Sequence, residues 1–126
     1  MFSKLFWIGI AGAAGALSRY GLAGFFQKVL KLSSFPIGTF IVNIVGCFIF
    51  GILWTVSLRH SSIDPKTRTA LLVGFTGSFT TFSTFIFENG ELFRASQWMA
   101  LTGNLVGQIV LGALALVAGI ALGKLV

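Results

Sequence analysis

The sequence predicts an all-α integral membrane protein with four transmembrane helices. Of its 126 residues, 56% are hydrophobic and 10% are charged. The mean hydropathy of +0.94 is far above that of a soluble domain. Four apolar stretches each have about the 20 residues that a spanning helix needs, and none alternates with the period of a transmembrane strand. These stretches are Leu5 to Phe26, Ile37 to Leu58, Thr69 to Phe87 and Trp98 to Leu122.

The connections between the stretches are short, at Gln27 to Pro36, Arg59 to Arg68 and Glu88 to Gln97. They leave no room for an extramembrane fold, so residues 1–126 are expected to form a single membrane domain. A basic start followed by apolar residues is also typical of a cleavable signal peptide. The first stretch, however, is long enough to span and continues past Arg19, so we interpret it as the first transmembrane helix.

Glycines recur at helical spacing in the first and fourth stretches. Such spacing lets helix backbones approach closely, either within one chain or between two copies. Because four short helices rarely enclose a polar pathway alone, we expect a homo-oligomer. The glycines are Gly9, Gly12 and Gly15, and the G-x-x-x-G pairs Gly103 with Gly107 and Gly119 with Gly123.

The net charge of +6 comes from scattered residues, which make no basic patch of the kind that binds nucleic acid. With four spans, both termini and the second connection share one side of the membrane. That side carries five basic residues against three on the other, a difference small enough to leave both insertions accessible. The five are Lys4, Arg59, Lys66, Arg68 and Lys124, and the three are Lys28, Lys31 and Arg94.

Three carboxamide side chains lie inside apolar stretches. Asn43 is near the centre of the second stretch, and Asn104 and Gln108, four residues apart, share a face of the fourth. At membrane depth such groups are costly without partners or water. Each alone fits interhelical hydrogen bonding, and together they favour a polar track. Arg19 snorkels to the interface, pairs with a buried group or attracts an anion into a vestibule.

The third stretch is the strongest candidate for a functional site. Six of the nine residues from Thr76 to Thr84 carry hydroxyls, and Phe79, Phe82 and Phe85 recur every three residues. Hydroxyls and glycines at this depth indicate a backbone that loosens where protein can satisfy it. Positive phenyl edges beside hydroxyl donors suit a small hydrated anion, whereas hydroxyl oxygens suit a cation. The residue types leave the sign of the ion open, and the aromatic spacing also fits packing.

The segment from Gly74 to Phe85, with its run TTFSTF from residue 80, resembles the signature of the small bacterial fluoride channels called Fluc or CrcB. The segment from Gly12 to Tyr20 resembles the family's glycine-rich first span with its arginine. The run PIGT from residue 36, which leads to Asn43, resembles the start of the second span. The resemblance covers essentially the whole chain and all four spans in order.

The resemblance implies a fluoride-specific channel in the bacterial inner membrane, through which the anion leaves the cytoplasm passively, so that its intracellular concentration and toxicity fall. It implies an antiparallel dual-topology homodimer with two pores and a broken third helix. A structural sodium ion (Na+) would be held by the main-chain carbonyls of Gly77 and Thr80. The fluoride pathway would comprise Asn43, Phe82, Phe85, Ser83, Thr84, Asn104 and Gln108, with Arg19 in the vestibule.

This chain departs from the family pattern at two places. Gly77-Ser78 stands where many members have two glycines, and Asn104 and Gln108 stand where serine or tyrosine is common. No titratable group lies in the middle of the implied pathway, which favours passive conduction over coupling to protons.

Two other functions compete with the channel. A small four-span drug exporter needs a buried acidic residue in its first span, where this chain has none and carries Arg19. An accessory membrane subunit would explain the glycines but not the run of hydroxyls and phenylalanines. An enzyme is not expected, because His60 stands alone in a connection, Cys47 has no polar partner in sequence and no metal-ligand spacing occurs.

Overall fold

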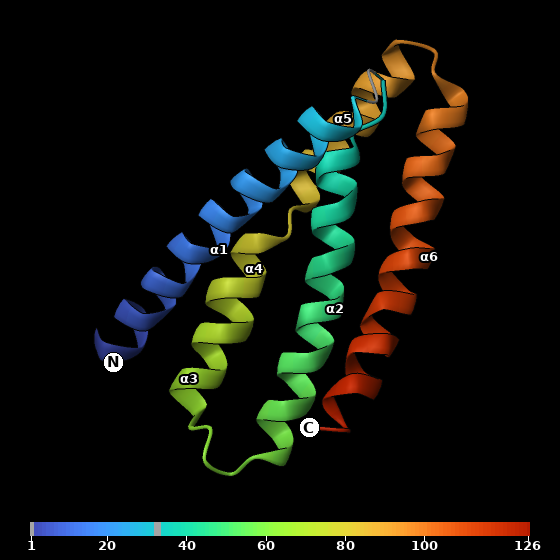
Figure 1. Cartoon of the computed structure of the whole chain (residues 1–126). Helices are drawn as coiled ribbons and strands as arrows, with labels where there is room; N and C mark the ends of the chain where they lie inside the picture. The colour runs from blue at the N-terminus through green and yellow to red at the C-terminus, as the bar shows by residue number, and fades with distance from the viewer. Residues whose placement is uncertain (1, 32–33) are drawn as a thin grey trace.

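The structure, a computed structural model, describes residues 2–31 and 34–126, where every regular element is helical (Figure 1). The predicted all-α class is therefore confirmed for these residues. Four long helical segments follow one another, and the third is divided into four pieces. The elements are α1 (Phe2–Leu30), α2 (Ile37–Arg59), α3 (Pro65–Thr69), η1 (Ala70–Thr76), α4 (Gly77–Phe79), α5 (Phe82–Arg94) and α6 (Trp98–Gly123).

Within the described residues, three segments are long and apolar enough to cross a membrane, namely α2, the run Pro65–Arg94 and α6. They identify a membrane protein by length and composition. Helix α1 has 29 residues, which is ample length at about 1.5 Å per residue. It does not reach the same apolarity, because glycines, serines and Arg19 interrupt its apolar residues. Its crossing of the membrane stays a prediction.

The helices extend beyond the predicted apolar stretches. Because α1 reaches Leu30 and α5 reaches Arg94, the prediction that connections begin at Gln27 and Glu88 was wrong. An apolar run ends where charged residues begin, but a helix can continue into the aqueous interface. There, Arg94 Nη1 lies 3.1 Å from Glu91 Oε1 on the preceding turn, which supports the last turn of α5.

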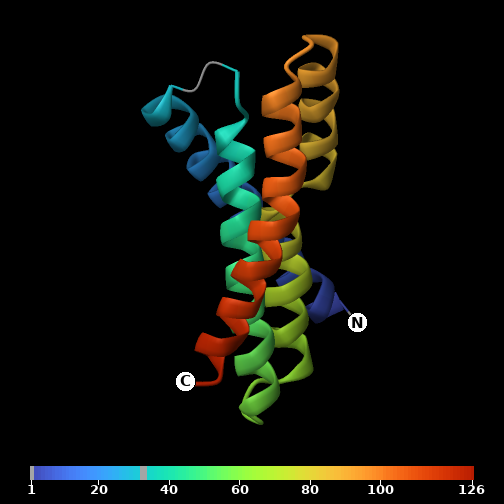
Figure 2. The same ribbon diagram turned by 90° about the vertical axis from the view of Figure 1, so that its right-hand side faces the viewer.

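Helices α2 and α6 lie side by side and run in the same direction, and α1 crosses η1 and α4 obliquely (Figures 1 and 2). Both termini and the connection between α2 and α3 lie toward one end of the molecule. The connection between α5 and α6 lies at the other end. The divided third segment thus runs from one end of the molecule to the other. Its pieces η1 and α4 contact α1 and α2, whereas α5 contacts α6 and α2.

Several glycines permit backbone contact within the chain. A Cβ atom added at Gly15 of α1 would lie 2.2 Å from the carbonyl oxygen of Phe75 in η1. One added at Gly119 of α6 would lie 2.2 Å from the carbonyl oxygen of Phe48 in α2. Even alanine would therefore push these helices apart. Gly9, by contrast, has open space beside it, so the glycine pattern predicted from sequence serves intrachain packing at some of its positions.

The third segment starts with an N-terminal cap, and after α3 its helix widens into π-helical turns. Asp64 Oδ1 accepts a hydrogen bond of 2.9 Å from Thr67 N ahead of Pro65, the first helical residue. Side-chain and backbone hydrogen bonds from Thr67 lower the pKa of the Asp64 carboxyl. The seven residues that follow α3 form the π-helix η1, where Thr76 Oγ1 donates to Leu71 O at 3.0 Å. π-Helical turns are uncommon and frequently accompany functional sites.

Candidate functional site

The third segment is interrupted between α4 and α5. Helix α4 ends at Phe79 and α5 begins at Phe82. Between them, Thr80 has φ −85° and ψ 160°, and Thr81 has φ −148° and ψ 115°, so both are extended. Figure 1 shows this short non-helical link halfway along the segment. Thr80 N still donates to Thr76 O at 3.1 Å, but the N–H and C=O of Thr81 need hydrogen-bonding partners outside the helix.

Asn43 of α2 supplies partners for the main chain of Thr81. Its Oδ1 accepts from Thr81 N at 2.8 Å, and its Nδ2 donates to Thr81 O at 3.2 Å. One carboxamide thus pairs with both polar groups of Thr81, as a neighbouring strand would. The Thr81 hydroxyl accepts from Thr84 N at 3.3 Å and caps α5.

These bonds release two main-chain carbonyls. In a continuous α-helix, Thr81 N would donate to the Gly77 carbonyl, and Thr84 N would donate to the Thr80 carbonyl. Both amides donate elsewhere, to Asn43 and to the Thr81 hydroxyl. Gly77 is exposed on the chain and Thr80 is half-buried. The carbonyls of Gly77 and Thr80 are therefore available as oxygen ligands, which hard cations prefer.

A chain of carboxamides leads away from the break. Asn43 Nδ2 also donates to Gln108 Oε1 at 2.7 Å, and Gln108 Nε2 donates to Asn104 Oδ1 at 2.9 Å. Asn104 Nδ2 donates to Asn89 Oδ1 at 3.0 Å, and Asn89 Nδ2 donates to Phe85 O at 2.8 Å. The three carboxamides singled out from the sequence lie in one connected series, which we call the carboxamide chain.

Sequence reasoning missed Asn89, although a signal for it exists. It lies four residues after Phe85 and therefore on the same face of α5. It is also a carboxamide in a segment that is long and apolar enough to cross a membrane, where an unpaired amide is costly. Asn89 is buried, and Asn104 has no exposed surface at all.

A cavity of about 290 Å³ lies beside the break. The phenyl rings of Phe82 and Phe85 are 5.9 Å apart at 46°, and the Phe82 side chain is 74% exposed, whereas that of Phe85 is 7% exposed. The structure therefore brings carboxamides and phenyl rings to one space. The lining residues are Asn43, Cys47, Thr80, Thr81, Phe82, Phe85, Gln108 and Ile109.

A second cavity, of about 350 Å³, lies between α1, α2 and the start of α5. Its polar lining includes Arg19, Thr39, Thr81 and Thr84, so Thr81 borders both cavities. The half-buried Arg19 places a positive charge in this cavity. Ser83 lines neither of these two cavities and is exposed.

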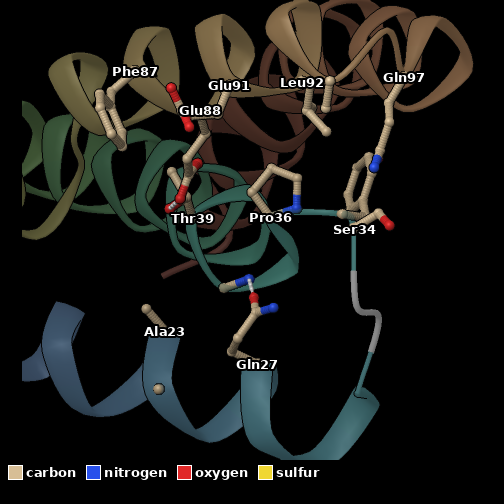
Figure 3. A pocket seen from close by; sticks show the side chains of 14 residues that line it. Ala23, Gln27, Ser34, Pro36, Thr39, Phe87, Glu88, Glu91, Leu92 and Gln97 are labelled. Carbon is tan, nitrogen blue, oxygen red and sulfur yellow. Dashed lines mark hydrogen bonds between the residues drawn. The ribbon is translucent and has the colours of Figure 1, made fainter.

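A third cavity, of about 590 Å³, lies near the start of α2 and the later turns of α5 (Figure 3). Thr39 Oγ1 donates to Glu88 Oε1 at 2.6 Å, and Gly38 N donates to Gln27 Oε1 at 3.3 Å. Among the described residues, the buried Glu88 Oε2 has no hydrogen-bond partner. The pairing of Glu88 with Thr39 was not foreseen from the sequence.

Replacing Asn43 by aspartate should destabilise the protein. A carboxylate oxygen would then face Thr81 O and Gln108 Oε1, with no N–H left to donate to either. Each unsatisfied buried polar group costs roughly 1–3 kcal/mol, so we expect a clear fall in the unfolding temperature in detergent. Gln97→Glu, the same chemical change at the start of α6, is the control. An Asn43→Asp variant as stable as this control would contradict the pairing.

The chain is similar to known proteins over its whole length. The family model described as CrcB-like protein, Camphor Resistance (CrcB) matches residues 6–120. The fluoride-specific ion channel FluC of Solidesulfovibrio magneticus is 49% identical over 126 residues, which are the whole of both chains. Proteins of the same name from Desulforapulum autotrophicum and Nitrosococcus oceani are 49% and 42% identical, again over the whole of both chains. The chain belongs to the CrcB family.

Proposed function

We propose that this protein is a fluoride-specific channel through which the anion leaves the bacterial cytoplasm passively, so that its intracellular concentration and toxicity fall. Relatives of equal length are named fluoride-specific ion channels. The observation that carries the proposal is the cavity beside the break, where amides, hydroxyls and two phenyl rings converge.

The chemistry of this cavity suits fluoride. The ion holds its water tightly, so a pathway must replace the hydration shell with many donors and still release the ion. Gln108 offers amide N–H, and the edges of Phe82 and Phe85 are positive. The hydroxyls of Thr80 and Thr81 donate to Thr76 O and Thr84 Oγ1 here, and they would turn from these partners to meet the ion. None of the lining residues is a carboxylate, as an anion pathway requires.

The remaining pathway residues are proposed in different roles. Arg19 and Thr84 line a vestibule, the cavity of about 350 Å³. Thr81 borders both this vestibule and the cavity of about 290 Å³ beside the break. Asn104 acts through Gln108, which it contacts. Ser83, exposed on the single chain, would meet the ion only where a second copy completes the wall.

We also propose an antiparallel dual-topology homodimer with two pores, in the inner membrane, in which α1 also spans and the third helix is broken. The five-to-three charge count favours it, because it sets no firm orientation. So does the exposure of Phe82 and Gly77 on the single chain.

Cysteines placed at the two termini should be labelled in part from each side of the membrane in cells. Labelling of all molecules from one side would refute dual insertion.

Fluoride efflux from liposomes that contain only the purified protein tests the channel function. We expect fluoride to leave, with little movement of chloride or potassium measured in parallel. Chloride moving as fast as fluoride would contradict the specificity. Potassium movement without fluoride would indicate a cation pathway.

Phe82→Ile and Phe85→Ile should each lower fluoride efflux severely. Isoleucine keeps much of the apolar volume, and such swaps usually cost less than about 1.5 kcal/mol, but the positive ring edge is lost. Efflux and gel filtration are measured together, and both variants should elute as the wild type does. Phe93→Ile, at the far end of α5, is the control and should conduct normally. Normal efflux in both test variants would show that these rings serve packing and not conduction.

We propose that Na+ is structural and binds the carbonyls of Gly77 and Thr80, whose helical donors are engaged elsewhere. A bound cation would supply positive charge to these carbonyl oxygens. Replacing sodium by a large organic cation should weaken the dimer or abolish fluoride efflux, measured by gel filtration and in liposomes. Sodium that crosses in fixed proportion to fluoride would mean a coupled transporter instead.

A further inference from the structure

The carboxamide chain has one polarity from end to end. It starts at Thr81 N and passes through Asn43, Gln108, Asn104 and Asn89, and each amide donates its N–H to the next oxygen. It ends at the carbonyl oxygen of Phe85. Both ends therefore lie on the main chain of one short segment, residues 81–85, which also carries the exposed ring of Phe82.

The two backbone ends enforce this polarity. A backbone N–H can only donate, and a backbone carbonyl can only accept. Asn43 is fixed because it meets both groups of Thr81, and Asn89 is fixed because its Nδ2 meets Phe85 O. If the side-chain amide of Asn104 or Gln108 were flipped, oxygen would face oxygen at one of its two contacts and N–H would face N–H at the other. The flip would leave buried groups unsatisfied.

The polarity decides which amide can offer an N–H to an anion. Both Nδ2 hydrogens of Asn43 are used, by Thr81 O and by Gln108 Oε1. Gln108 Nε2 has two hydrogens, and among the described residues only Asn104 Oδ1 takes one. Gln108 also lines the cavity of about 290 Å³. Its second N–H is therefore free for a ligand, whereas a reversed Gln108 would present an oxygen to an anion.

We propose that Asn89 is a positioning residue for fluoride conduction. It lines none of the cavities described here and acts by locking Asn104, which in turn keeps the N–H2 end of Gln108 available to the ion. This inference rests on the proposed channel function. It assigns Gln108 as the amide donor to the ion and Asn43 as the residue that fixes the break.

A double-mutant cycle on fluoride efflux from liposomes tests the inference. Asn89→Leu removes the anchor, and Gln108→Leu removes the donor. Each should lower efflux about tenfold, the size expected for one oriented hydrogen bond. Because both changes act on the same N–H, the double variant should be about as slow as either single one, not about a hundredfold slower. Asn89→Gln, which retains donor and acceptor, should recover most of the efflux.

Thr55→Val is the matched control. Thr55 is buried, and its hydroxyl also donates to a carbonyl four residues earlier, Gly51 O at 2.9 Å, but it lies outside the carboxamide chain. It should conduct normally. If Asn89→Leu does not elute as the wild type does, the cycle is run with Asn89→Ala, which also removes the acceptor for Asn104 but adds no apolar bulk.

Three results would overturn the inference while the wild type conducts fluoride. They are normal efflux in the Asn89 variant, effects of Asn89 and Gln108 that multiply, and an equal loss in Thr55→Val. A wild type without fluoride efflux would instead overturn the proposed function, and this inference with it.

Discussion

The pairing between the Asn43 carboxamide and the main chain of Thr81 is the interaction on which the rest of the site depends. A helix that stops inside a membrane exposes peptide groups that lipid cannot satisfy. One side chain of α2 takes both polar groups of Thr81. As a result, the carbonyls of Gly77 and Thr80 lose their helical donors, α5 restarts on a threonine cap, and a cavity opens beside the break.

The surrounding helices make room for this arrangement. One turn after Asn43, a Cβ atom added at Gly46 would lie 2.1 Å from Thr80 Cγ2, so α2 supplies both the partner for the break and the space beside it. On the opposite side, the backbone of α1 meets η1 at Gly15. Close packing on both sides holds the break in a fixed position, as a site built from aligned donors requires.

Much of the fold could be predicted from the sequence because apolar runs of spanning length carry a strong signal. Asn43, Asn104 and Gln108 were also recognisable, since an amide at membrane depth demands a partner. The partners themselves were not recognisable. Asn89 and the contact of Thr39 with Glu88 depend on how α2, α5 and α6 pack, which no local pattern reports. The hydroxyl-rich run indicated a loosened backbone, but hydropathy does not report the π-helical geometry of η1.

Hydrogen exchange at the Thr81 amide, compared between the wild type and Asn43→Leu in detergent, tests the central claim most directly. Exchange of a buried amide reports whether its hydrogen bond is made. If Asn43 holds the break, the wild-type amide should be protected, and the variant amide should exchange at least about tenfold faster, as expected for the loss of one hydrogen bond. Equal protection in both proteins would show that Thr81 has another partner and that the break does not depend on Asn43.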